Sequence, residues 1–321
     1  MILAQIDLAT AIEVVLNGLQ QGAIFAMLGI GLTIILGTMN FLNLAHGALY
    51  LIGGYAGMLF IRENQLTAGF LFDNGITTIG LDLGFAAALV LVPLTVFVVG
   101  LLMERFVAEP FYDRPETDQL LVTFGLALIV QELIKATIGG NTFQPAAPTR
   151  ILGVSVGGPI ELPIVGNYPQ WRLYLVVIAL VVIGLTYLVI EKTDFGLIVQ
   201  AGTEDSEMVR LLGIKISRSY SLVFAMGAAL AGFAGLVGIS FQTVSPQIGT
   251  EQALIPAFLV LVVGGAGSVV GAIVGGLVLG ITIAGMTVLA SQWAQIVLYA
   301  VAAGVLLFRP EGLFGSVGVS E

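Results

Sequence analysis

The sequence predicts an all-α polytopic membrane protein, and three observations lead to this class. Of the 321 residues, 58% are hydrophobic and only 10% are charged, whereas a soluble domain carries about 25% charged residues. The mean hydropathy of the chain is +1.05. The 42 glycines suit helices that pack closely in a bilayer. A soluble globular enzyme is therefore excluded.

Apolar runs between polar breaks divide the chain into nine segments, and we expect about 8–9 transmembrane segments, since one span needs roughly 20 residues. The segments cover residues 13–36, 47–61, 83–103, 119–138, 171–190, 219–241, 253–267, 268–286 and 290–308. The second and seventh segments have about 15 residues each, or roughly 22 Å at 1.5 Å per residue. Each of these two segments is either a tilted helix that is only partly inserted in the bilayer or a half-helix that lines a cavity.

The basic residues set the expected orientation. If residues 191–218 are cytoplasmic, seven basic residues lie inside, namely Arg105, Arg114, Lys192, Arg210, Lys215, Arg218 and Arg309. The other four, Arg62, Lys135, Arg150 and Arg172, lie outside or near the outer boundary. This modest bias places the N-terminus outside and the C-terminus in the cytoplasm. The first apolar stretch lacks the features of a cleaved signal peptide, so we expect it to stay in the membrane.

The order of the segments predicts two inverted repeats within a single transmembrane domain, 1–321. Residues 1–138 form the first repeat and 219–308 the second, because segments one to four and six to nine run in opposite senses with a short segment second in each. Such paired short segments point to a substrate path; the alternative is a set of unrelated glycine-rich helices. Residues 139–170 are rich in Pro and Gly, which predicts an irregular or β-rich external loop.

Residues 191–218 predict a short amphipathic helix on the cytoplasmic side. Thr203 can cap its N-terminus, and Glu204 and Asp205 suit the positive end of its dipole. Gly213 is placed to end the helix.

This helix has one apolar face, formed by Met208, Leu211 and Leu212 at helical spacing, with Arg210 near its C-terminus. An interfacial helix lying on lipid is one interpretation. Its polar side is acidic, however, whereas anionic headgroups attract Lys and Arg. A groove in a partner protein is therefore the better match.

Polar and small residues at the two breaks are candidates for a translocation path. The candidates are Asn43, His46, Gly47, Ser245, Pro246, Gly264 and Gly265. His46 is either a structural histidine bonded to backbone carbonyls or a residue that gates the path or contacts the solute. Asn17, Gln20 and Gln21 give the first segment a polar stripe that faces other helices or the path, with helix packing favoured.

Several absences limit the chemistry. With no Cys and one His, we expect no metal site, no cofactor and no catalytic residue. The net charge of −9 argues against nucleic acid as a partner. The sequence also has no Gly-x-x-x-x-Gly-Lys-Ser/Thr phosphate loop, so we do not expect this chain to hydrolyse ATP.

Motifs spread over the whole chain carry a family resemblance. They are Asn17-Gly18-Leu19, Gly31-Leu32-Thr33-Ile34-Ile35-Leu36-Gly37, Asn43-Leu44-Ala45-His46-Gly47, Phe195-Gly196, Arg210-Leu211-Leu212-Gly213-Ile214, Ala228-Ala229-Leu230-Ala231-Gly232-Phe233-Ala234-Gly235, Gly264-Gly265-Ala266-Gly267-Ser268 and Phe308-Arg309-Pro310-Glu311-Gly312-Leu313-Phe314-Gly315. In this order and spacing, the chain resembles the permease subunits of ABC importers for branched-chain amino acids, the leucine/isoleucine/valine type, and among them the shorter permease.

The resemblance implies a multi-pass protein of the cytoplasmic (inner) membrane that transports branched-chain amino acids. The partners it implies are a second permease, two ATP-binding ABC subunits and an external solute-binding protein. It also implies that the helix in 191–218 seats in a groove of the ATPase. Alternatives are the same importer class acting on urea, short amides or other amino acids. An ion-coupled secondary transporter or channel is disfavoured, because no predicted segment has a central Asp or Glu.

Overall fold

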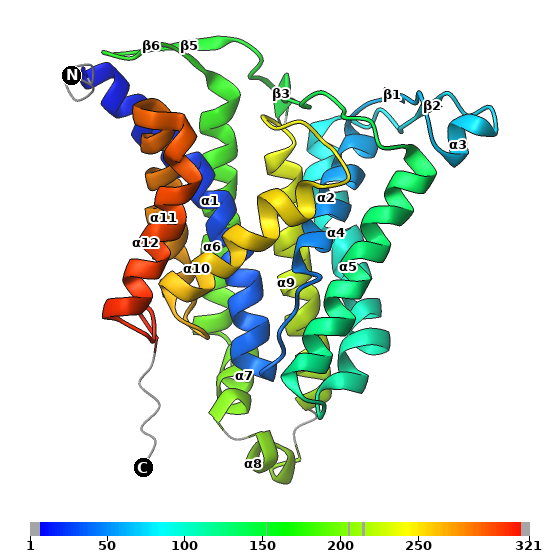
Figure 1. Cartoon of the computed structure of the whole chain (residues 1–321), viewed down its shortest axis with the longest axis vertical. Helices are drawn as coiled ribbons and strands as arrows, with labels where there is room; N and C mark the ends of the chain where they lie inside the picture. Colours follow the sequence, from blue (N-terminus) through cyan, green and yellow to red (C-terminus); the bar gives the residue numbers. More distant parts are fainter. Residues whose placement is uncertain (1–6, 152, 205, 214–215, 316–321) are drawn as a thin grey trace.

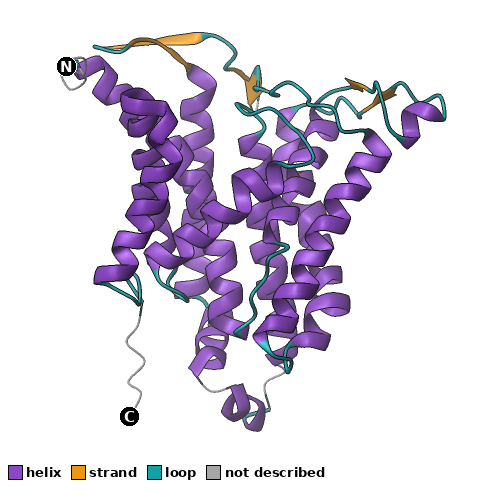
Figure 2. Ribbon diagram, viewed as in Figure 1, coloured by secondary structure: helices purple, strands orange, loops and turns teal. Residues whose placement is uncertain are grey.

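Long apolar helices make up most of the computed structural model, which describes residues 7–151, 153–204, 206–213 and 216–315 (Figures 1 and 2). The nine expected segments correspond to α1 (Leu8–Met39), α2 (His46–Ile61), α4 (Phe85–Met103), α5 (Glu116–Ile138), α6 (Gln170–Lys192), α9 (Ile216–Gly238), α10 (Ile255–Gly264), α11 (Val269–Ala290) and α12 (Ala294–Phe308). Within the described residues, six helical stretches are long and apolar enough to cross a membrane. The chain is therefore a multi-pass membrane protein.

Two of these stretches contain more than one element. Val269–Phe308 holds α11 and α12, joined by the 3₁₀ turn η5 (Ser291–Trp293). Phe85–Phe111 continues α4 through the π-helical turn η2 (Glu104–Ala108) and the 3₁₀ turn η3 (Glu109–Phe111). A π-helical turn, η4 (Gly249–Leu254), precedes α10 and extends it to Gly249–Gly264.

Small elements close the two ends of the helix bundle. At the end that carries the N-terminus, Figure 1 shows hairpins and α3 (Phe70–Asp73). The antiparallel pairs are β1 (Asn64–Gln65) with β2 (Thr78–Ile79), β3 (Arg150–Ile151) with β4 (Val154–Ser155), and β5 (Pro159–Leu162) with β6 (Gly166–Pro169). The β-rich character expected for 139–170 is thus confirmed. At the opposite end lie α7 (Asp194–Glu204) and α8 (Ser206–Leu211).

The centre of the bundle is formed by α1 and α9, which are the most buried of the long helices. Their backbones touch where two glycines face each other. A Cβ atom on Gly31 would lie 2.7 Å from the carbonyl oxygen of Gly227, and a Cβ on Gly227 would lie 2.7 Å from that of Gly31. Small residues at such crossings let membrane helices approach closely. Around this pair, α11 packs on α1, while α2 and α4 pack on α9.

The two short helices begin side by side inside the bundle. Segment 40–45 runs from the lower end of α1 up to α2, and segment 239–248 comes down from the upper end of α9 to η4 (Figure 1). At the junction, a Cβ on Gly249 would lie 2.5 Å from the carbonyl oxygen of Gly47. Backbone contact of this kind leaves no room for a side chain at either position.

Both irregular segments have their backbone groups satisfied by neighbouring parts of the chain. Two side chains of α5 serve segment 40–45. The Leu42 N–H donates to Oε1 of Gln119 at 3.3 Å, and the Leu44 N–H donates to Oγ1 of Thr123 at 3.1 Å. Irregular backbone is tolerated at membrane depth only when protein or water supplies such partners. The position of α2 therefore depends on α5.

Replacing Thr123 by the isosteric Val should destabilise the chain. The substitution removes the acceptor of the Leu44 N–H, and an unpaired buried donor costs about 1–3 kcal/mol. We expect a lower thermal unfolding midpoint for purified Thr123→Val in detergent than for Thr137→Val. Thr137 is the matched control, because it lies on the same helix and its hydroxyl donates to the Leu133 carbonyl at 2.7 Å. Equal midpoints for the two variants would contradict this role of Thr123.

Candidate functional site

An exposed apolar edge on α8 and the residue that follows it lies at the lower tip of the molecule. We define this coupling edge as Met208, Leu211 and Leu212, whose exposed fractions are 52%, 76% and 72%. Figure 1 shows α8 at the end opposite to the hairpins, below the helices that form the bundle. The predicted apolar face of the 191–218 segment therefore lies at the surface. Leu211 and Leu212 are among the more exposed of the described apolar residues.

The predicted start of this helix is wrong. Thr203 and Glu204 belong to the last turn of α7 rather than to a cap and first turn, and α8 begins at Ser206. The reason is that α7 is fixed earlier in the chain by packing. Val199 is buried, and Gly196 lies so close to the Ile190 carbonyl that no side chain fits there.

The predicted end of the helix is confirmed by the backbone of Gly213. Its φ is +82°, in the left-handed region that favours glycine after a helix. Asp205 lies outside the described residues, and so do the side chains of Thr203, Glu204 and Arg210. The described part of the predicted coupling site is thus its apolar edge and its terminating glycine.

The candidates for the translocation path at the first break are buried in the interior of the bundle. Asn43 and His46 are fully buried, with exposed fractions of 0%. The Nε2–H of His46 donates to the Leu28 carbonyl at 3.1 Å, which is the contact that a structural histidine makes. Gly47 is held against Gly249, as described above. This group positions the start of α2, and both amide atoms of Asn43 and Nδ1 of His46 have no hydrogen-bond partner in the described residues.

The remaining candidates do not join that group. Gly264 packs against Gly271, and Gly265, with φ of +98°, packs against Gly312. Both contacts connect the end of α10 to the start of α11 and to the chain after α12. Ser245 and Pro246 lie instead in segment 239–248, between α9 and η4. The small size of Gly264 and Gly265 is therefore required for packing.

A polar cleft is present where the sequence did not predict one. It consists of two adjoining cavities, of about 310 Å³ and about 130 Å³, that share Gln21, Gln242 and Ile283. The cleft lies between α1, segment 239–248, η4, α11 and α12. Its polar lining is Asn17, Gln20, Gln21, Arg172, Gln242, Glu251, Gln252, Thr287, Gln295 and Tyr299.

The polar stripe of α1 faces this cleft. Asn17 Oδ1 accepts hydrogen bonds from the Arg172 guanidinium and from the Tyr168 hydroxyl, both at 3.0 Å. Burial raises the pKa of Tyr168, which keeps its hydroxyl protonated as a donor. The sequence favours helix packing as the role of the stripe. Asn17 makes such contacts, while Gln20 and Gln21 also line the cavity.

Several polar atoms in the cleft are buried and have no hydrogen-bond partner in the described part of the chain. They are Gln20 Nε2, Arg172 Nε, Gln242 Oε1 and Gln252 Oε1. Buried polar groups are normally paired, so unpaired ones need an explanation. Gln242, Glu251, Gln252 and Gln295 were missed in the sequence. The available signal was the polar run Thr250-Glu251-Gln252, directly ahead of an apolar helix.

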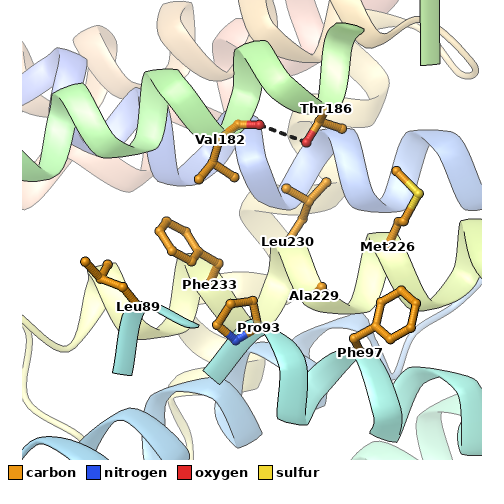
Figure 3. A pocket seen from close by; sticks show the side chains of 9 residues that line it. All are labelled: Leu89, Pro93, Phe97, Val182, Thr186, Met226, Ala229, Leu230 and Phe233. Carbon is orange, nitrogen blue, oxygen red and sulfur yellow. Dashed lines mark hydrogen bonds between the residues drawn. The ribbon is translucent and has the colours of Figure 1, made fainter. Parts of the chain in front are cut away.

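A second pocket, between α4, α6 and α9, is apolar (Figure 3). Its volume is about 240 Å³, and Pro93, Phe97 and Phe233 are among its lining residues. Its hydroxyl group, on Thr186, already donates to the Val182 carbonyl at 2.9 Å. This pocket offers no free polar group to a charged or polar solute.

A buried carboxylate lies at the lower end of the bundle. Glu104, only 2% exposed, accepts hydrogen bonds from the Tyr112 hydroxyl at 2.8 Å and from the Ser221 hydroxyl at 2.7 Å. The two donors hold the carboxylate between α4 and α9. Because it is satisfied by the protein and lies near the end of its helix, Glu104 is a packing residue in this arrangement.

Comparison with known proteins identifies the family. The family described as branched-chain amino acid transport system / permease component matches residues 14–306. The permease BraD of Pseudomonas aeruginosa is 32% identical over 97% of this chain and 97% of its own length. The permease LivH of Escherichia coli is 30% identical over 95% of this chain and 96% of its own length.

A more distant relative is the probable permease LivH of Methanocaldococcus jannaschii, 25% identical over 81% of this chain and 76% of its own length. No solved structure gives a significant match. The family match spans nearly all the described helices, including α8 and the cleft. This chain belongs to the branched-chain amino acid transport system permease family.

Proposed function

We propose that the chain is a permease subunit of an ABC importer for branched-chain amino acids in the cytoplasmic membrane. Its relatives BraD and LivH are named as high-affinity branched-chain amino acid transport permeases. The proposed assembly contains a second permease, two ATP-binding subunits and an external solute-binding protein. The observation that carries the proposal is the coupling edge, an apolar surface outside the bundle that a soluble partner can cover.

The pattern of helix contacts supports the two inverted repeats. We pair α1, α2, α4 and α5 with α9, α10, α11 and α12, in that order. Four contacts then have a counterpart under this pairing. The α2–α4 contact corresponds to α10–α11, α1–α11 to α9–α4, α2–α9 to α10–α1, and α2–α5 to α10–α12. The mutual contacts Gly31–Gly227 and Gly47–Gly249 join equivalent helices, as expected near a twofold axis.

The positions of the basic residues support the orientation. Arg105, Lys192, Arg218 and Arg309 all lie at the same end of the bundle as α8, at or just beyond the ends of α4, α6, α9 and α12. Cytoplasmic ends of membrane helices carry such an excess. The N-terminus and the hairpins then face outward.

Orientation is tested by thiol labelling, because the natural chain has no cysteine. We expect Thr149→Cys, beside the β3–β4 hairpin, to react with a membrane-impermeant maleimide added to intact cells. Ser206→Cys, at the start of α8, should react only after the membrane is permeabilised. The reverse pattern would overturn the topology.

The coupling edge should be required for binding of the ATPase. Burial of a Leu side chain is worth about 1.5–3 kcal/mol, so Leu211 and Leu212 can supply much of the contact. We expect Leu211→Asp combined with Leu212→Asp to release the ATP-binding subunit during purification and to abolish uptake. Membrane insertion should be unchanged, since α8 lies outside the bundle.

The matched control for this variant is Ile164→Asp. Ile164 is also an exposed apolar residue, with an exposed fraction of 62%, but it lies in the β5–β6 turn at the opposite end. The backbone φ at this position is +76°, which Asp tolerates at least as well as Ile does. Normal co-purification and uptake in the double variant would refute the role assigned to α8.

A further inference from the structure

We propose that the polar cleft between α1, η4, α11 and α12 is the part of the translocation pathway that this chain forms. In the proposal, the cleft binds a zwitterionic amino acid. This inference rests on the proposed function and adds the residues and the chemistry of recognition. In the proposal, Arg172 meets the carboxylate of the solute and Glu251 meets its ammonium group.

The two charged groups of the cleft are separated along it. Arg172, near the start of α6, lines the larger cavity together with Asn17 and Gln20. Glu251 lines the smaller cavity and belongs to η4, which starts at Gly249 inside the bundle. A guanidinium only donates hydrogen bonds and a carboxylate only accepts them. The cleft therefore has a cationic donor near the end with the hairpins and an anionic acceptor further in.

Unpaired polar groups are present in both cavities. Gln20 and Arg172 in the larger cavity, and Gln252 in the smaller one, each have a buried side-chain atom without a hydrogen-bond partner in the described residues. Gln242, shared by both cavities, is a further example. A glutamine amide can both donate and accept, so these side chains can pair with either charged group of an amino acid.

Lipid cannot cover this surface at low cost. Glu251 is exposed and has no ion-pair partner in the described residues, and Gln295 on α12 is exposed beside it in the cleft. Ionised groups at membrane depth face a bundle interior or a water-filled cavity, because burial in hydrocarbon is costly. Since η4 begins inside the bundle, Glu251 faces a space that water, the solute or a polar group of a neighbouring subunit must fill.

Thiol accessibility tests whether the cleft is a passage. Gln242→Cys and Gln252→Cys are compared with Val181→Cys, which lies near the middle of α6 with an exposed fraction of 55%. The complete importer is reconstituted in liposomes with its binding protein outside, and uptake of L-leucine is measured. A charged, impermeant methanethiosulfonate added outside should reduce uptake at least tenfold in both cleft variants and leave Val181→Cys unchanged.

The charge assignment is tested with Glu251→Gln in the same complex. We expect uptake of L-leucine to fall at least tenfold while assembly with the ATPase persists. Glu161→Gln, an exposed carboxylate on β5, is the control and should transport normally. If Glu251→Gln does not assemble, Glu251 acts in packing and the assignment of the ammonium site is overturned.

The outcomes separate the two proposals. If the unmodified importer transports no branched-chain amino acid, the proposed function fails. If it transports L-leucine, but the cleft cysteines do not react or their modification leaves uptake intact, the passage lies elsewhere and this inference is overturned. Normal uptake by Glu251→Gln overturns the assignment of the ammonium site.

Discussion

The structure depends on satisfying backbone polar groups inside the membrane at two places where the helices are interrupted. A peptide group without a partner in hydrocarbon costs several kcal/mol. Segment 40–45 finds its partners in side chains of α5. Segment 239–248 finds them in the 139–170 loop, where Phe143 and Val244 exchange two backbone hydrogen bonds of 2.8 and 2.9 Å, and Ala146 N–H donates to the Ile239 carbonyl at 2.8 Å. Each short helix is therefore held by an element distant in sequence.

Close glycine packing follows from the same constraint. Because α2 and η4 start inside the bundle, their first turns must fit against each other and against α1 and α9. Gly47 and Gly249 allow this for the short helices, and Gly31 and Gly227 allow it for the long ones. Packing of small residues is a main source of stability between membrane helices, where burial of apolar surface contributes little. The interrupted segments in turn leave polar side chains beside them, and these line the cleft.

The sequence was sufficient to predict the helices but only part of the site. Hydrophobicity and length located the nine apolar helices, and apolar residues at i, i+3 and i+4 located the face with Met208, Leu211 and Leu212. The start of α8 was misplaced, since Thr203 has the local features of a cap while the packing of Gly196 and Val199 extends α7 past it. Local signals do not reveal such tertiary contacts.

The residues that line the cleft were harder to predict. The direction in which each side chain points depends on the rotation and the register of several helices. Gly47 and Gly264 are small, which suggested a path, but their missing side chains make room for backbone. Gln242, Glu251 and Gln295 are isolated polar residues in separate segments, and no spacing along the chain relates them. Only their tertiary arrangement shows that they line one cleft.

The tolerance of Gly249 for a side chain tests the central claim, that the two short helices begin side by side inside the bundle. A Cβ on Gly249 would lie 2.5 Å from the Gly47 carbonyl oxygen, whereas a Cβ on Gly184 of α6 would meet nothing within 4 Å. Purified Gly249→Ala should therefore unfold at a lower temperature in detergent than Gly184→Ala, which is the matched control. Equal thermal unfolding midpoints for the two variants would contradict the account.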